Sequence, residues 1–269
     1  MVDLEAISGL PIKLDDAGLL VFGMDVVVDE HGERLFDALT PVALDPDACR
    51  GNQSVAYYMD NGVYLREDAS RLADVPMRYE LTLVPPGRLG REMIKTHGHR
   101  HCPEPRSGLD YVEICEVLTG TAHFLMQTLE LDGPDAPMVF LLEANPGDKI
   151  ILPPGLDHCT INPGAEPLLF SDVIARGVSG IYDRFAETRG AAYLEVSDNG
   201  EPHFVPNPSY RNVARMEVLR AEDYPELDLT RDRPLYTAFL DGLGERWAFL
   251  NDPRLFDASF PDLAALVAK

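Results

Sequence analysis

The sequence predicts an all-β protein, a barrel or sandwich built from many short strands. Two observations lead to this prediction. Short runs of Val, Ile, Leu, Phe and Tyr recur along the chain, and the 22 prolines and 21 glycines separate them as turn residues. Hydrophobic residues make up 45% of the 269 residues, enough for a sizeable core, whereas apolar patterns with helical spacing are sparse.

The expected strands follow one another at short intervals, each with apolar residues between turn signals. In chain order they span residues 18–28, 77–84, 91–97, 111–118, 121–129, 138–142, 149–152, 159–161 and 168–175. Short helices are expected at residues 67–73 and 180–189. Another helix should begin near Pro261, because a proline at the start and Asp262 in the first turn favour a helix N-terminus.

We expect a single domain, residues 1–269, with three parts. Residues 1–74 form an N-terminal β arm, residues 75–176 form the β core, and residues 177–269 form a C-terminal wrap of helical and irregular segments. No stretch has the composition of a flexible linker, so the sequence gives no reason to divide the chain into independent domains.

The charge of the chain disfavours some classes of binding partner. Asp and Glu number 45 against 23 Lys and Arg, a formal net charge of −22, which repels nucleic acid and anionic lipid. No apolar run approaches the roughly 20 residues of a membrane helix, and the first residues lack a secretory pattern. The four cysteines have no CxxC spacing, so we expect reduced thiols and a cytoplasmic protein. The acidity fits either a salt-rich cytoplasm or a basic partner.

Three histidines and a glutamate stand in a pattern that suits a metal ion. His99 and His101 are two residues apart, which on a strand directs both side chains to one face. Glu113 lies on the next expected strand, and His158 follows a turn with the sequence P-P-G. Three imidazoles and one carboxylate suit a divalent first-row metal, and iron, manganese, nickel and zinc all remain open.

These residues and their turns resemble the cupin superfamily. Its second motif, G(x)5PxG(x)2H(x)3N, is matched in full by residues 147–162, and its first is matched as H-x-H, a longer loop and E(x)6G. The six-residue step to Gly120 favours Glu113 over Glu116 as the carboxylate ligand. The resemblance implies a double-stranded β-helix, or jelly roll, in which two ligand-bearing hairpins converge inside the barrel.

A closer resemblance is to the cupin-type glucose-6-phosphate isomerases, over roughly residues 57–210. The segments R-Y-E-L-T-L-V-P-P-G, K-T-H-G-H-R-H and E-I-C correspond to that family's Thr before P-P-G, its K-T-x-G-H-Y-H and its E-I-Y. The resemblance implies that Thr82 and Thr96 bind the substrate phosphate and that Tyr182 lies near the sugar. It implies one divalent metal ion held by His99, His101, Glu113 and His158.

The implied activity is metal-dependent interconversion of an aldose and a ketose phosphate, such as glucose 6-phosphate and fructose 6-phosphate, through an enediol-like intermediate. Glu113 is the expected proton carrier between C1 and C2, with His158 or a hydroxide at the metal as alternatives. Lys95 is a candidate for positive charge near the phosphate. Thr96 and His99 share a face only if strand alternation breaks near Gly98, where a glycine suits a bulge.

Two departures from the family leave the substrate open. Arg100 and Cys115 stand where the family has tyrosine, and Cys115 has the strand parity of Glu113, so we expect its side chain on the substrate side. The alternative function is therefore a cupin oxygenase, isomerase or epimerase for another metabolite. A third interpretation is a sugar-binding cupin without turnover.

The N-terminal arm predicts a homodimer. The segment 18–28 contains L-L-V-F-G-M, which is too apolar to project into solvent. Cupin isomerases of this type form dimers through added strands, which also cover sheet edges. Packing of the arm on its own barrel is the alternative.

Overall fold

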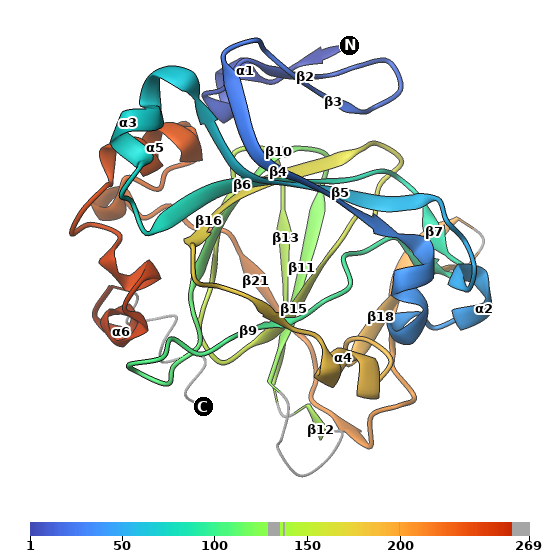
Figure 1. Cartoon of the computed structure of the whole chain (residues 1–269). Helices are drawn as coiled ribbons and strands as arrows, with labels where there is room; N and C mark the ends of the chain where they lie inside the picture. The colour runs from blue at the N-terminus through green and yellow to red at the C-terminus, as the bar shows by residue number, and fades with distance from the viewer. Residues whose placement is uncertain (129–134, 137, 199, 260–269) are drawn as a thin grey trace.

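The computed structural model describes residues 1–128, 135–136, 138–198 and 200–259 (Figure 1). Two sheets face each other and form the barrel. The larger sheet contains, in spatial order, β14 (Lys149–Leu152), β10 (Glu113–Thr119), β16 (Leu168–Ala175), β6 (Met77–Val84), β5 (Val55–Leu65) and β4 (Val26–Leu35). The smaller sheet contains β15 (Asp157–Ile161), β11 (Ala122–Gln127), β13 (Val139–Ala144) and β21 (Glu217–Arg220).

Shorter sheets surround the barrel. The N-terminal one, at the top of Figure 1, contains β1 (Val2–Asp3), β2 (Ile12–Leu14) and β3 (Leu20–Phe22). A second contains β19 (Glu201–Pro206), β18 (Tyr193–Asp198), β8 (Glu92–Met93) and β7 (Arg88–Leu89). Two further pairs join β9 (Arg100–His101) to β17 (Gly180–Ile181), and β12 (Asp135–Ala136) to β20 (Asn212–Val213).

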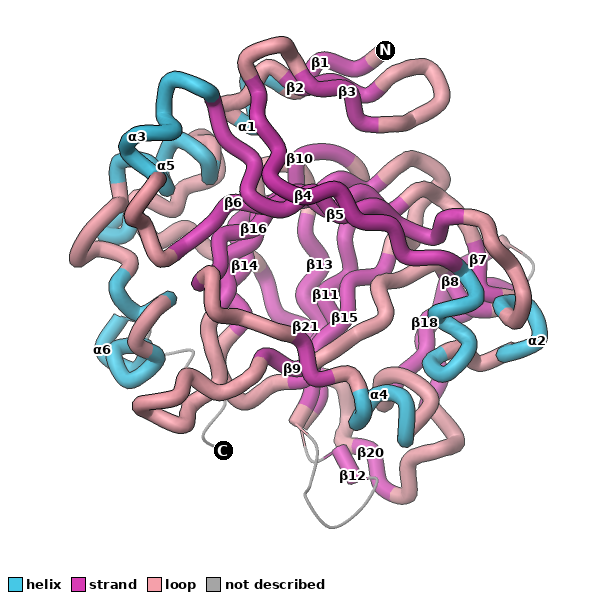
Figure 2. The backbone as a smooth tube through the Cα atoms, viewed as in Figure 1, coloured by secondary structure: helices cyan, strands magenta, loops and turns pink. Residues whose placement is uncertain are grey.

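The helices are short and lie at the periphery, as the cyan segments of Figure 2 show. The α-helices are α1 (Glu5–Ser8), α2 (Pro46–Cys49), α3 (Ala69–Leu72), α4 (Asp183–Glu187), α5 (Leu235–Asp241) and α6 (Phe256–Ser259). 3-10 helices span Phe36–Val42, Arg66–Asp68, Pro225–Leu227, Ala248–Leu250 and Pro253–Leu255. Within the described ranges, no helix combines the length and the apolar character that crossing a bilayer requires.

The predicted all-β cupin fold is confirmed. The strands predicted at residues 77–84, 149–152 and 168–175 form with the same bounds, as β6, β14 and β16. The strand predicted at residues 18–28 is wrong in extent, because Gly23 begins a turn that separates β3 from β4. Of the strand predicted at residues 91–97 only β8 is regular. The end of the strand predicted at residues 121–129 and the helix predicted from Pro261 lie outside the described residues.

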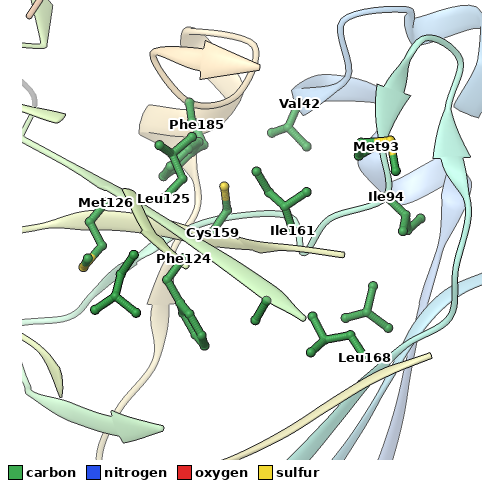
Figure 3. Packing of buried hydrophobic residues seen from close by; sticks show 14 of the residues in the cluster. Val42, Met93, Ile94, Phe124, Leu125, Met126, Cys159, Ile161, Leu168 and Phe185 are labelled. Atoms are coloured by element: carbon green, nitrogen blue, oxygen red, sulfur yellow. The ribbon is translucent and has the colours of Figure 1, made fainter. Parts of the chain in front are cut away.

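Two apolar cores lie on the two sides of the larger sheet. The first fills the barrel between the sheets, where the Phe124 and Phe170 rings meet edge to face with centroids 5.8 Å apart. The same cluster continues on the other face of the smaller sheet, where Figure 3 shows Cys159 and Ile161 pointing towards Phe185 and Val42 and away from Phe124. The second lies on the outer face, where the N-terminal segments and α5 pack against the sheet through residues such as Tyr79 and Tyr236. The outer face is therefore covered, and the site is built on the inner one.

Candidate metal centre and active-site pocket

Three imidazoles meet inside the barrel. The ligand-capable atoms of His99, His101 and His158 all lie within 4.8 Å of one another. Backbone pairing brings two of them together, since the His99 N–H donates to the His158 carbonyl and the His158 N–H donates back, each at 2.9 Å. His101 follows on β9. The structure therefore brings the three histidines named from the sequence to one point.

Glu113 completes this group, and Glu116 does not. Glu113 Oε2 lies 3.0 Å from His101 Nε2 and 3.9 Å from His158 Nε2. Glu116 faces the other side of β10, where its carboxylate accepts hydrogen bonds from Lys149 Nζ at 2.7 Å and from the Leu235 N–H at 2.7 Å. The strand parity that separates these two carboxylates also decides which of them reaches the imidazoles.

The donor set fits a divalent metal ion. His101 Nδ1 lies 2.9 Å from the Tyr111 carbonyl, an arrangement that makes Nδ1 a hydrogen-bond donor and directs Nε2 towards Glu113 and the centre. Burial and the neighbouring His101 lower the pKa of His158 to about 4, so its imidazole is neutral and can donate a lone pair. Imidazole nitrogens that converge beside a carboxylate are a donor set that a first-row metal binds.

Glu113 supplies the negative charge of the centre. Burial works against ionisation, but hydrogen bonding and charge interaction with His101, together with His158, hold the pKa of Glu113 below its usual value. Cys115 Sγ donates to Glu113 Oε1 at 3.1 Å. The carboxylate is therefore ionised and anchored from two sides.

A cavity of about 290 Å³ opens from this centre across the inner face of the larger sheet. Strand register arranges its floor in three rows, which we call the metal row, the middle row and the far row. From β10 towards β5, the metal row holds Glu113, Ile174 and Arg78, the middle row Cys115, Asp172, Glu80 and Asn61, and the far row Val117, Phe170, Thr82 and Met59. Successive rows lie about 6.7 Å apart, because side chains on one face are two residues apart.

Thr96 reaches the cavity from the opposite side through a bulge. Lys95 pairs with Ile161 and His99 with His158, so one extra residue lies between these two bridges. Gly98 has a φ of +81°, a conformation that L side chains rarely adopt, and a Cβ there would lie 3.1 Å from Cys159 Cβ. Thr96 and His99 consequently both line the cavity, as the expected break in alternation requires.

Two sequence-based assignments near the site are wrong. Lys95 is 2% exposed and does not line the cavity, because its ammonium pairs with Glu92 and donates to the Val42 carbonyl at 2.9 Å. Its charge is therefore neutralised away from the substrate side. Cys115 is fully buried and contacts Glu113 rather than the open cavity.

Tyr182 lines the cavity, and it contacts a residue that the sequence did not suggest. Its ring lies 5.5 Å from the His99 ring and lines the cavity. The Arg34 guanidinium lies 5.6 Å from the Tyr182 ring centroid, and Arg34 stands opposite Tyr57 on the neighbouring strand. Arg34 forms no ion pair within the described residues, and its Nε is buried without a partner. Nothing in the sequence E-R-L-F marks this arginine, because only tertiary pairing brings it beside two residues that line the cavity, Tyr57 and Tyr182.

The middle row was also not predicted. Asp172 lines the cavity, is 4% exposed, and makes no hydrogen bond or ion pair among the described residues. Burial and the adjacent Glu80 raise the pKa of Asp172 well above its usual value. Glu80 itself pairs with Arg78. The cavity thus has a metal-type donor set at one end, hydroxyl groups at the other, and carboxylates between them.

Comparisons with known proteins identify related chains. A family model described as glucose-6-phosphate isomerase (GPI) matches residues 33–210. A glucose-6-phosphate isomerase of Pyrococcus abyssi is 30% identical over 150 residues, which cover 56% of this chain and 72% of the relative. One of Thermococcus onnurineus is 28% identical over 167 residues, covering 58% of this chain and 82% of its own. A solved Bacillus subtilis oxalate decarboxylase is 16% identical, with a TM-score of 0.32, over 48% of this chain and 29% of that one.

Proposed function

The chain belongs to the glucose-6-phosphate isomerase family, and from this membership we propose that it interconverts glucose 6-phosphate and fructose 6-phosphate with the help of a divalent metal ion. One observation carries the proposal beyond family membership. A single cavity contains the imidazole and carboxylate donor set and, at its other end, hydroxyl groups suited to a phosphate. An aldose–ketose isomerase of a sugar phosphate needs both in one place.

The proposed metal ligands are His99, His101, Glu113 and His158, with iron, manganese, nickel and zinc all compatible with this donor set. When bound, the ion supplies Lewis-acid polarisation of the C1 and C2 oxygens. The bond from His101 Nδ1 to the Tyr111 carbonyl fixes the orientation of that imidazole before any ligand binds.

Glu113 is the proposed proton carrier between C1 and C2. Its carboxylate lines the cavity and is ionised, and Cys115 Sγ holds one of its oxygens at 3.1 Å. A carboxylate in this position removes the proton from one carbon and returns it to the other, with the enediol as intermediate. Proton transfer by a positioned side chain contributes typically 10²–10⁴-fold to a rate.

The proposed phosphate end contains Thr82, Thr96, Tyr57 and Arg34. The first three line the cavity, and Arg34 lies beside them without an anionic partner among the described residues. The Tyr57 hydroxyl accepts from the His97 N–H at 3.2 Å and retains its own proton as a donor. In a chain of net charge −22, local donors of this kind must bind a dianion against the long-range field.

We also propose a cytoplasmic homodimer. All four cysteines are free, which is typical of proteins in a reducing compartment. β4 is an edge strand of the larger sheet, and addition of a strand from a second copy would cover its unpaired backbone groups.

The decisive experiment is product analysis with fructose 6-phosphate, carried out with metal-loaded protein in the presence and absence of O2. We expect glucose 6-phosphate to form at the same rate in both conditions. A product that appears only with O2 would replace the proposal by an oxygenase. Tight sugar phosphate binding without any product would indicate a sugar-binding cupin instead.

A further inference from the structure

The middle row lies where the central part of a bound sugar phosphate must lie. The metal row and the far row are about 13 Å apart, the length of four strand residues, and the middle row is halfway between them. This argument rests on the proposed function, which puts C1 and C2 at the metal row and the phosphate beside Thr82. The remaining hydroxyl-bearing carbons then pass over Asp172, Glu80 and Asn61, all of which line the cavity.

Asp172 is the residue of this row that is free to bind. Glu80 is already paired with Arg78, and Asn61 Nδ2 lies 3.5 Å from Glu30 Oε2. Asp172 is 4% exposed, faces the cavity, and has no hydrogen-bond or ion-pair partner among the described residues. A carboxyl group that is buried and unpaired is costly in the empty protein, and it becomes satisfied when hydroxyl donors arrive.

The chemistry of the row also discriminates between the two ends of the substrate. A carboxyl group presents mainly acceptor oxygens, which suit the hydroxyl groups of a sugar, whereas a phosphate dianion needs hydrogen-bond donors. The middle row contains two carboxyl groups, one of them already paired with Arg78, so the cavity offers a phosphate fewer donors there than at the hydroxyls of Thr82 and Thr96. The row therefore sets the direction in which a phosphorylated polyol lies.

We propose that Asp172 determines the specificity of this site for a polyhydroxylated chain, by accepting hydrogen bonds from sugar hydroxyls between the reacting carbons and the phosphate. The neighbouring Cys115 is consistent with this role. It stands directly across from Asp172 in the same row, and its small side chain leaves the space above the row to the substrate.

The test compares wild type with Asp172→Asn and Asp172→Ala, and uses Ser171→Ala as the matched control on the same strand. Ser171 is buried and its side chain faces away from the cavity. Calorimetry measures binding of sorbitol 6-phosphate, a polyol phosphate that cannot isomerise, and of inorganic phosphate. We expect Asp172→Ala to weaken sorbitol 6-phosphate about ten- to a hundred-fold and to leave inorganic phosphate within about two-fold. Ser171→Ala should change neither.

Turnover gives the second measurement. Wild type should prefer fructose 6-phosphate over at least one of its 3-deoxy and 4-deoxy analogues, and Asp172→Ala should lose that preference through KM. Asp172→Asn keeps a carbonyl acceptor and should retain part of it. A loss of kcat with unchanged KM and unchanged sorbitol 6-phosphate binding would overturn the proposal, because it would make Asp172 an acid–base group. Unchanged binding and unchanged preference would overturn it as well.

The two proposals fail in different ways. If wild type does not isomerise fructose 6-phosphate but binds sorbitol 6-phosphate through Asp172, the proposed function is wrong and the assignment of Asp172 stands. If wild type isomerises fructose 6-phosphate and the Asp172 variants bind and turn over like wild type, the function stands and this assignment is wrong. The melting temperature of each variant confirms that the comparison is made between folded proteins.

Discussion

His101 illustrates how one backbone contact orients a proposed ligand. Its Nδ1 donates to the Tyr111 carbonyl, so its Nε2 is directed to the centre of the site, where Glu113 Oε2 lies 3.0 Å away. A position prepared in this way depends on the imidazole itself, and a substitution that keeps only its size should not replace it.

We expect His99→Ala, His101→Ala and His158→Ala each to lose both bound metal and activity. His31→Ala should lose neither, because His31 is exposed on β4 and pairs with Asp60 at 2.5 Å, outside the donor set. Elemental analysis of the purified variants, together with turnover of fructose 6-phosphate, measures both properties. A metal-free wild type with full activity would contradict the prediction.

Thr96→Val should lower kcat/KM for fructose 6-phosphate about ten- to a hundred-fold, because a hydrogen bond to a charged group contributes roughly 1.5–3 kcal/mol. Metal content should not change, and turnover of unphosphorylated fructose should change little. Thr96 Oγ1 also accepts from the Thr160 N–H at 3.0 Å, so the matched control is Thr96→Ser, which keeps that acceptor. If Thr96→Ser loses as much as Thr96→Val, or if wild type prefers fructose, the phosphate assignment is wrong.

At the residue scale, the sequence predicted which side chains converge better than it predicted the partners of charged groups. His99, His101, Glu113 and His158 were grouped from their spacing, and they do meet, because short-range alternation and turns set where they point. Lys95 was misplaced because its ammonium pairs with Glu92 and donates to the Val42 carbonyl, a contact 53 residues away in the sequence that no local pattern reveals. Arg34 was missed because only the pairing of β4 with β5, a long-range contact, brings it beside Tyr57 and Tyr182.

At the scale of elements, β5 shows how tertiary pairing overrides a local signal. Its sequence contains D-N-G, a typical hairpin turn, and no strand was predicted there. The strand runs straight through it, because β4 pairs along one edge and β6 along the other. Strands without such an internal turn signal, such as β6 and β16, were predicted to the residue.

The start of α5 is tied to the barrel by a buried ion pair. Glu116 accepts from Lys149 Nζ and from the Leu235 N–H, and both side chains are almost fully buried. We expect Lys149→Met to lower the free energy of unfolding by ~3–5 kcal/mol, since it leaves Glu116 as an uncompensated buried charge. Denaturant unfolding of the variant measures this loss.

A second variant and a change of pH sharpen that prediction. Lys149→Met combined with Glu116→Gln should recover part of the loss, because Gln is neutral and still accepts from the Leu235 N–H.

Burial raises the pKa of Glu116 to about 7 even beside Lys149, and loss of the lysine should raise it further. A carboxyl whose pKa rises on folding stabilises the folded chain at low pH and loses that contribution as pH rises. The deficit of Lys149→Met should therefore be larger at about pH 8 than at about pH 5, and an equal deficit at both would contradict this account.

At the scale of the whole molecule, fewer apolar residues of the N-terminal arm are available for a dimer interface than the sequence suggested. Leu20 and Phe22 of the N-terminal arm pack against the chain's own second core, whereas Met24 is 94% exposed beside the β4 edge. We expect light scattering at micromolar concentration to give a mass of about twice 29.8 kDa. Met24→Glu should weaken the dimer if this edge forms the interface. A mass near that of one chain for wild type would reject the prediction.

The net charge of −22 makes a prediction about salt. A sugar phosphate dianion approaches against the field of the protein, and the Debye length falls from about 30 Å at 0.01 M salt to about 8 Å at 0.15 M. Added salt should therefore raise kcat/KM for fructose 6-phosphate, the reverse of what a basic enzyme would show. Unphosphorylated fructose is the control and should respond little. A decrease with salt for the phosphorylated sugar would indicate that local cations dominate its association.

The bulge at Gly98 has a consequence for how such a site can change over generations. The residue lies between Thr96, at the proposed phosphate end, and His99, at the metal end, and it is the extra residue that lets both face the cavity. Deletion of one residue there would restore alternation and turn one of the two side chains away. In a descendant of this protein, a substitution could alter Thr96 or His99 separately. The deletion of one residue at Gly98 would instead separate metal binding from phosphate recognition in one step.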